Sequence, residues 1–103
     1  MNTKNIRCVF VASAFLLTSS GVALAAGDAA AGGEKAAQCT SCHGANGEGS
    51  GANPKIAGMD QAAFVKAMND YKSGARKHMM MEMFAKKLSD QDNADLAAFY
   101  AAK

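Results

Sequence analysis

Two cysteines and a histidine stand close together in the sequence, at Cys39, Cys42 and His43, in the pattern C-x-x-C-H. On a helical turn both thiols project from one side as i and i+3, and the imidazole of His43 follows one turn after Cys39. Two such thiols can add to the two vinyl groups of a haem while the histidine binds its iron. The pattern therefore predicts one covalent haem c, attached through Cys39 and Cys42, with His43 as the proximal iron ligand.

Three other uses of the same five residues are open. A thioredoxin-like redox pair lies beside a strand in a βαβ unit, and no stretch of this sequence alternates as a strand does. A structural zinc site needs four ligands, and the other candidates are one histidine and a run of thioethers. A disulfide across two intervening residues would be strained and would close too short a loop to add much stability. Haem attachment is the interpretation that the pattern favours.

Residues 1–25 are predicted to be a secretory signal peptide that is removed. Lys4 and Arg7 precede an apolar run at 8–17, and Ala23-Leu24-Ala25 matches an A-x-A cleavage site. The run is about half of the roughly 20 apolar residues that cross a bilayer. We therefore expect export to the periplasm, no membrane insertion, and one domain at residues 26–103.

The charge balance excludes one class of partner. The predicted leader holds two of the eleven basic residues and none of the nine acidic ones, so residues 26–103 are formally neutral. No stripe of Lys and Arg with interleaved aromatic residues remains after its removal. We expect no nucleic-acid partner.

Large apolar side chains are scarce in residues 26–103. The aliphatic ones are Ile56, Val65, Leu88 and Leu96, set among many alanines that each bury little area. A domain of this size has a marginal core even when its side chains are large. We expect a large apolar cofactor to fill the interior, with methionines supplying adaptable contacts around it.

The helix signals place the first half of the domain. Asp28 caps a short helix running toward Gln38, and the pair Gly32-Gly33 inside it indicates that another helix passes very close. Residues 44–58 are rich in glycine and asparagine and predict a loop.

Two further helices follow. Asp60 caps a helix in which Phe64, Met68 and Tyr71 form one buried stripe, and Gly74 ends it. Residues 75–87 are predicted to be an irregular methionine-rich segment. Ser89, with Asp92 three residues later, starts a last helix that continues to Ala102 and buries Leu96, Phe99 and Tyr100. The sequence predicts an all-α fold.

Motifs along most of the chain resemble one family, the class I c-type cytochromes of the short bacterial monohaem kind, or c-553-like group. The matching stretches are Gly27-Asp28, Gly32, C-x-x-C-H-G at 39–44, Pro54-Lys55-Ile56-Ala57-Gly58, Tyr71-Lys72-Ser73-Gly74, Arg76, Leu88-Ser89-Asp90-Gln91-Asp92 and Asp95-Leu96-Ala97-Ala98-Phe99-Tyr100. The resemblance implies three main helices and loops wrapped around one covalent haem. Gly32 resembles the family glycine at which the first helix crosses the last.

The resemblance also assigns the ligands around the iron. The carbonyl of Pro54 would accept a hydrogen bond from the other ring N–H of His43 and so fix the orientation of that ligand. The distal methionine of the family lies five residues after the arginine matching Arg76 and seven before the leucine matching Leu88, which implies Met81.

The residues themselves leave the sixth ligand open. The segment His78-Met79-Met80-Met81-Glu82-Met83 offers four thioethers and one imidazole. Met80 and Met79 are the alternatives to Met81, and His78 could make a bis-histidine site but is expected to lie in a partly exposed loop. A copper(I) site of the four methionines is chemically sensible, yet it would leave the haem without its sulfur ligand.

The resemblance implies a soluble periplasmic one-electron carrier with His/Met ligation, not an enzyme, that shuttles electrons between respiratory or dehydrogenase partners. Redox proteins would dock at an exposed haem edge, and the chain would be a monomer or weak dimer. Candidate steering charges are Lys55, Lys66, Lys72, Arg76 and Lys77. The alternatives are a cytochrome subunit of a larger multi-subunit oxidoreductase and a five-coordinate haem sensor.

Overall fold

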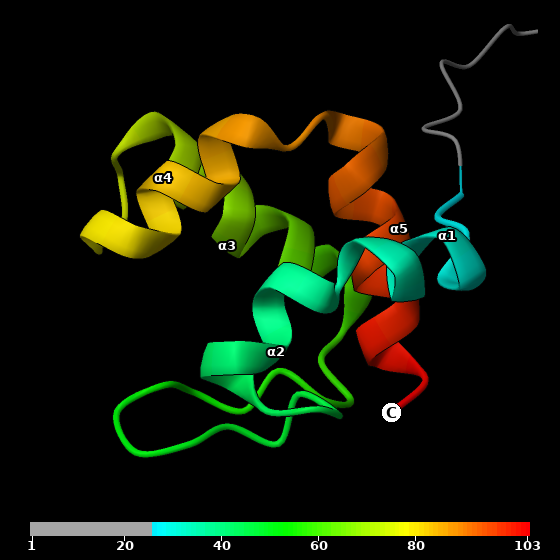
Figure 1. The fold of residues 1–103 in the computed structure, drawn as a ribbon. Coiled ribbons are helices and arrows are strands. Elements are labelled where there is room, and N and C mark those ends of the chain that lie inside the picture. The colour runs from blue at the N-terminus through cyan, green and yellow to red at the C-terminus, as the bar shows by residue number, and fades with distance from the viewer. Residues whose placement is uncertain (1–25) are drawn as a thin grey trace, which may run out of the picture.

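The computed structural model describes residues 26–103, and the predicted signal peptide at 1–25 lies outside the described residues. The described residues form helices and one isolated β-bridge, and they contain no β-strand (Figure 1). The helices are α1 (Ala29–Lys35), α2 (Ala37–His43), α3 (Gln61–Ser73), α4 (Met79–Lys87) and α5 (Asp90–Ala101). The predicted all-α fold is confirmed. Between residues 26 and 103, no helix has the length and hydropathy needed to span a bilayer.

α1 lies directly against α5, near the two ends of the described chain (Figure 1). A Cβ atom on Gly32 would lie 2.0 Å from the carbonyl oxygen of Asp95. A Cβ on Gly27 would lie 1.9 Å from that of Ala94. Both distances are far inside van der Waals contact, so glycine is required where the two backbones meet. The close helix approach predicted from Gly32-Gly33 is therefore confirmed.

A buried carboxylate joins the same two helices. Asp95 has only 4% of its side chain exposed, and its oxygens accept hydrogen bonds from the Asp28 backbone N–H at 2.8 Å, Lys35 Nζ at 2.5 Å and Gln91 Nε2 at 2.8 Å. These donors, led by the Asp28 N–H, lower the pKa of Asp95 to about 2. Lys35 also contacts Asp92 at 2.8 Å. These ion pairs join α1 to α5 in addition to the close backbone contact at Gly32.

α3 begins and ends where the sequence predicts. The Asp60 carboxylate accepts the Ala63 N–H at 3.0 Å, and Gly74 ends the helix with a φ of 81° in the left-handed region. Phe64 and Met68 are buried on its inner face. α3 packs against both α4 and α5 and thereby connects the two.

The core is small and centred on α5. Leu96, Ala97 and Tyr100 are fully buried, and the Tyr100 ring packs against Phe64 and Phe99 with centroids 6.0 and 5.0 Å away. Asn93 is also fully buried on this helix. Among the described residues, neither Oδ1 nor Nδ2 of Asn93 has a hydrogen-bond partner. An unpartnered amide inside the core lowers stability.

Two expectations about the helices were wrong. The methionine-rich segment is not irregular, because residues 79–87 form α4 with His78 as its N-cap and Lys86 and Lys87 in the last turn. The helix predicted after Asp28 divides at Ala36, whose carbonyl accepts the N–H of Cys39 as in a tightened turn, so α1 and α2 are separate. The described residues thus form five helices.

Candidate functional site

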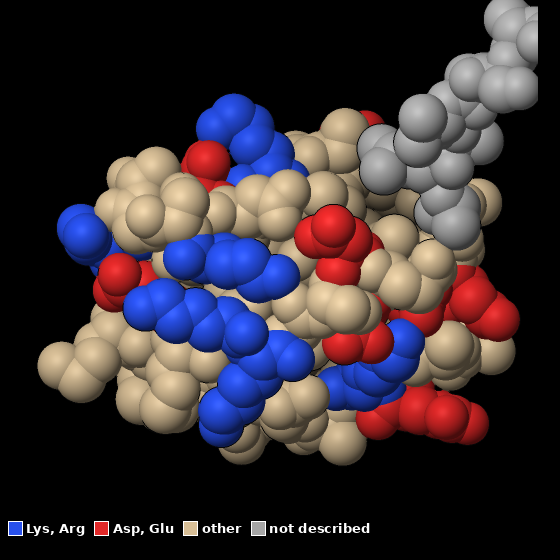
Figure 2. Space-filling view, turned by 90° about the horizontal axis from the view of Figure 1, so that it is seen from above, with Lys and Arg blue, Asp and Glu red and all other residues tan. Residues whose placement is uncertain are grey.

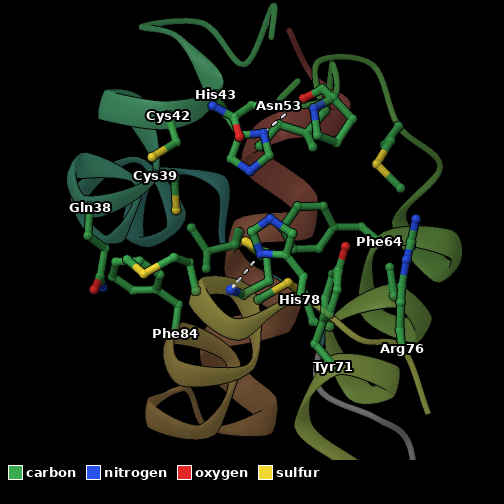
Figure 3. Close-up of a pocket in the computed structure, with 18 of the residues that line it drawn as sticks. Gln38, Cys39, Cys42, His43, Asn53, Phe64, Tyr71, Arg76, His78 and Phe84 are labelled. Atoms are coloured by element: carbon green, nitrogen blue, oxygen red, sulfur yellow. Dashed lines mark hydrogen bonds between the residues drawn. The ribbon is translucent and has the colours of Figure 1, made fainter. Parts of the chain in front are cut away.

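A cavity of about 630 Å³ lies between α2, the 44–60 loop, α3 and α4 (Figure 3). Its walls are formed by Gln38, Cys39, Cys42, His43, Ala52, Asn53, Pro54, Lys55, Ile56, Met59, Phe64, Ala67, Met68, Tyr71, Arg76, His78, Met80, Met81, Phe84, Leu88 and Leu96. Most of these side chains are apolar or aromatic. The cavity has the size and lining of a site for a large apolar cofactor.

α2 brings both cysteines to one wall of the cavity. Cys39 is partly buried against the core, whereas Cys42 is exposed, and both thiols are free. Burial raises the pKa of the Cys39 thiol above its usual value. A redox-active C-x-x-C pair relies on a lowered thiol pKa. The environment of Cys39 therefore argues against the thioredoxin-like alternative.

His43 stands at the end of α2, and its ring points into the cavity (Figure 3). The side chain is buried, and Nδ1 lies 2.8 Å from the carbonyl oxygen of Pro54. A carbonyl can only accept, so Nδ1 carries the proton and donates it. The neutral ring then has a free lone pair on Nε2, as an iron ligand requires.

The 44–60 loop fixes the carbonyl that orients His43. Gly44 stops α2 with a φ of 90°, and the Gly49 N–H returns to the His43 carbonyl at 2.7 Å. Ile56 and Ala57 both donate to the Gly47 carbonyl, at 2.8 and 2.9 Å. These bonds close the loop on both sides of Pro54.

α4 forms the opposite wall. His78, Met80, Met81 and Phe84 line the cavity. Met81 is partly buried and packs on the core, whereas Met80 is 48% exposed.

The other two methionines of this segment do not line the cavity. Met79 is 84% exposed and Met83 is 43% exposed. The four thioethers are therefore divided between the cavity wall and the outer surface. This division disfavours the copper(I) site that would use all four.

The donor set fits a haem. Two thiols and a histidine lone pair face the cavity from α2, and soft thioethers face it from α4. The charged residues Lys55 and Arg76 also line it, without any carboxylate among the described lining residues, which suits the acidic side chains of a haem. No three His, Cys, Asp or Glu side chains of residues 26–103 gather as metal ligands, so this region offers no structural zinc site.

Some features of the site were not foreseen. Met59, from the loop before α3, adds a thioether to the lining. It lies outside the methionine-rich segment at residues 75–87. Lys66 and Lys72 were candidate steering charges. Lys66 instead pairs with Asp70 at 2.6 Å, and Lys72 Nζ donates to the Leu88 carbonyl. Lys55 and Arg76 remain at the cavity.

The sequence shows which family the chain belongs to, and that family fits the geometry of the cavity. The sequence profile of the family described as cytochrome c matches residues 29–101, which is most of the chain. The chain therefore belongs to the cytochrome c family, and the resemblance to class I c-type cytochromes is confirmed. Membership implies covalently bound haem c, and members are electron-transfer proteins rather than enzymes.

Individual relatives agree. The chain is 48% identical over 85 residues to a cytochrome c4 of Pseudomonas aeruginosa, covering 82% of this chain and 42% of that one. It is 38% identical over 82 residues to cytochrome c-554(548) of Halomonas halodenitrificans, covering 76% of this chain and 99% of the relative. The solved structure of reduced recombinant cytochrome c4 from Pseudomonas stutzeri superposes with a TM-score of 0.71 at 36% identity, covering 76% of this chain and 46% of that one. The chain spans about half the length of the cytochromes c4 that it matches.

Proposed function

We propose that this protein is an exported, periplasmic one-electron carrier with a single haem c per chain, bound in the cavity between α2 and α4. Cys39 and Cys42 would hold the haem through two thioethers, and His43 and Met81 would bind its iron. Bound there, the haem would supply a one-electron couple between the ferrous and ferric states. The observation that carries the proposal is the pairing of His43 with the Pro54 carbonyl inside a cavity that also receives both thiols and Met81.

Each protein group has a defined part in this function. The bond to Pro54 keeps the His43 ring in one tautomer and one orientation, so that its lone pair faces the cavity. A thioether opposite a neutral imidazole favours the reduced state more than a second nitrogen ligand does. The apolar walls formed by α3 and α5 exclude water and disfavour the extra positive charge of the oxidised state.

Met81 is favoured over its neighbours by burial. It lines the cavity and packs on the core, whereas Met80 is about half exposed. Met79 points away from the cavity lining and is 84% exposed. A ligand sulfur must be held in place by its surroundings, and of these three methionines Met81 is the one that packs against the core.

Partner docking would use the side of the molecule where the cavity opens. Lys55 and Arg76 stand in the lining, and the Arg76 guanidinium lies 5.1 Å from the centroid of the Tyr71 ring. Figure 2 shows basic side chains gathered on one face of the molecule, and the last turn of α4 carries Lys86 and Lys87. Such a face would steer acidic partner surfaces, and its effect should weaken as salt is added.

The test is an optical spectrum of the exported protein and of two matched variants. The wild type should contain one haem per chain, and the ferric form should show the weak long-wavelength sulfur-to-iron band. Met81→Ala should lose this band, and Met80→Ala should keep it.

Four results would contradict the proposal or part of it. A colourless folded protein would remove its basis, and loss of the band in Met80→Ala alone would move the ligand by one residue. Rapid stoichiometric binding of carbon monoxide to the reduced protein at neutral pH would favour the five-coordinate sensor. Constant co-purification with a second polypeptide would favour the subunit of a larger oxidoreductase.

A further inference from the structure

His78 faces the cavity from the wall opposite His43 (Figure 3), and the proposed function gives it no part. Its ring Nδ1 lies 3.3 Å from the backbone nitrogen of Met81, and its own backbone N–H donates to Glu82 Oε2 at 3.3 Å. His78 is thus the N-cap of α4, and one reciprocal pair of bonds closes the first helical turn. The N–H that the ring holds belongs to Met81, whose sulfur is the proposed distal ligand.

The hydrogen bond also fixes the tautomer of His78. A backbone N–H can only donate, so Nδ1 of His78 must accept with its lone pair, and the neutral ring carries its proton on Nε2. His43 is in the opposite state, because its Nδ1 donates to the Pro54 carbonyl and its Nε2 lone pair is free. A metal ion needs such a lone pair. Of the two imidazoles at the cavity, His43 is ready to bind iron, and His78 cannot do so through Nε2 while it caps α4.

The position of the cap matters because of what surrounds it. Met79 and Met80 precede Met81 in the same first turn, and Met80 also lines the cavity. An uncapped first turn has unsatisfied N–H groups and frays. Fraying here would loosen Met81 and would allow the half-exposed Met80 sulfur to compete for the same place.

We propose that His78 is a positioning residue: by accepting the Met81 N–H it holds the first turn of α4 so that Met81 presents its sulfur to the haem iron, and it is not itself a ligand. This inference rests on the proposed function, because it presumes that Met81 binds the iron. A histidine at this position caps the helix through Nδ1. The same hydrogen bond keeps the proton on Nε2, so the ring cannot bind iron through that atom.

The test compares two variants of the haem-loaded full chain, His78→Asn and His78→Ala. Asparagine is among the best N-cap residues and offers a side-chain oxygen in place of Nδ1, whereas alanine removes the cap. The ferric His78→Asn protein should keep the sulfur-to-iron band at full strength. His78→Ala should lose a large part of it, and the Met81 amide should exchange its hydrogen about fivefold faster, the change expected from loss of one cap.

Either of two results for the His78 variants would overturn the inference. If His78→Ala keeps the full band and the wild-type exchange rate at Met81, the cap does not position the ligand. If His78→Asn loses the band as completely as His78→Ala does, the imidazole acts in a way that capping cannot replace.

Internal controls separate a local effect from a general one. The amides of α5 serve as the reference, and an equal rise in their exchange rate in His78→Ala would show general destabilisation and count against the inference. Met81→Ala separates this inference from the proposed function. If Met81→Ala keeps the band, the ligand assignment itself fails, whereas a loss of the band in Met81→Ala with no change in His78→Ala overturns the positioning role alone.

Discussion

The contact of α1 with α5 should fail if Gly32 is changed to Ala. The new Cβ would lie 2.0 Å from the Asp95 carbonyl oxygen and 2.8 Å from Phe99 Cβ. An ordinary contact begins near 3.4 Å, so the helices would have to separate by about 1.4 Å. Because the obstacle is backbone, neither side can rotate away. The same separation would stretch the bond from the Asp28 N–H to Asp95, which is 2.8 Å long.

Gly33 provides the matched control on the same helix. A Cβ there would lie 3.1 Å from Phe99 Cε2, an atom of a ring that can shift by a few tenths of an ångström. Both substitutions bring the same gain of about 1 kcal/mol in helix propensity. They therefore differ only in what the added methyl group meets.

The expected effect follows from these two terms. Overpacking against backbone should cost about 3 kcal/mol, the upper part of the usual range, and the propensity gain offsets about 1 kcal/mol of it. Gly32→Ala should thus lower the free energy of unfolding by about 2 kcal/mol, or roughly 10 °C in Tm for a domain of this size. Gly33→Ala should change it by no more than about 0.5 kcal/mol.

Urea unfolding of the haem-loaded proteins, followed by far-ultraviolet circular dichroism, measures both values. The two variants must have the same haem content and the same dependence of free energy on urea. If Gly32→Ala is as stable as Gly33→Ala, the two helices do not meet at the distance described, and the reasoning fails.

Two further predictions concern polar groups on α5. Asn93→Leu should raise the free energy of unfolding by about 1–2 kcal/mol in the same urea assay, because it removes a fully buried amide that has no hydrogen-bond partner within residues 26–103. A loss of stability would show that the amide is satisfied. Asp95 has a folded pKa of about 2 against an ordinary 3.8, so its contribution is complete above pH 4 and is lost as the pH falls toward 2. In unfolding curves measured over a pH series, Asp95→Asn should reduce the loss of stability between pH 4 and pH 2. If stability falls with pH as steeply as in the wild type, other carboxylates cause the acid sensitivity.

Helices with ordinary caps were predictable from the sequence. Asp60 and Gly74 bound α3, and the side chain of Ser89 and the carboxylate of Asp92 form the reciprocal box that starts α5. In each case the capping side chain acts on residues two to four positions away, so the signal is local. The close contact of α1 and α5 was also predictable, because only glycine tolerates it.

α4 was not predictable, because it lacks such local signals. Its cap is a histidine, which is not among the residues that usually begin helices, and its first positions are a run of methionines with no clear periodicity. Asn93 lies three residues before Leu96 and seven before Tyr100, so the helical spacing places it on the buried face although an amide seldom enters a core. At the cavity, the C-x-x-C-H pattern predicted which residues lie on one wall, whereas the thioether of Met59 comes from a loop that carries no motif.

The bonds from Asp95 to Lys35 at the end of α1 and to Asp28 at its N-cap span 60 and 67 residues of sequence, most of the described chain. Among the described helices, α1 packs chiefly on α5, and closing so long a loop is entropically unfavourable and late in folding. The hydrogen bonds around Pro54 and His43, by contrast, join residues no more than 11 positions apart and use no residue of α5. Residues 39–57, which carry both thiols and the Pro54 carbonyl, can therefore make these local bonds before α5 is present.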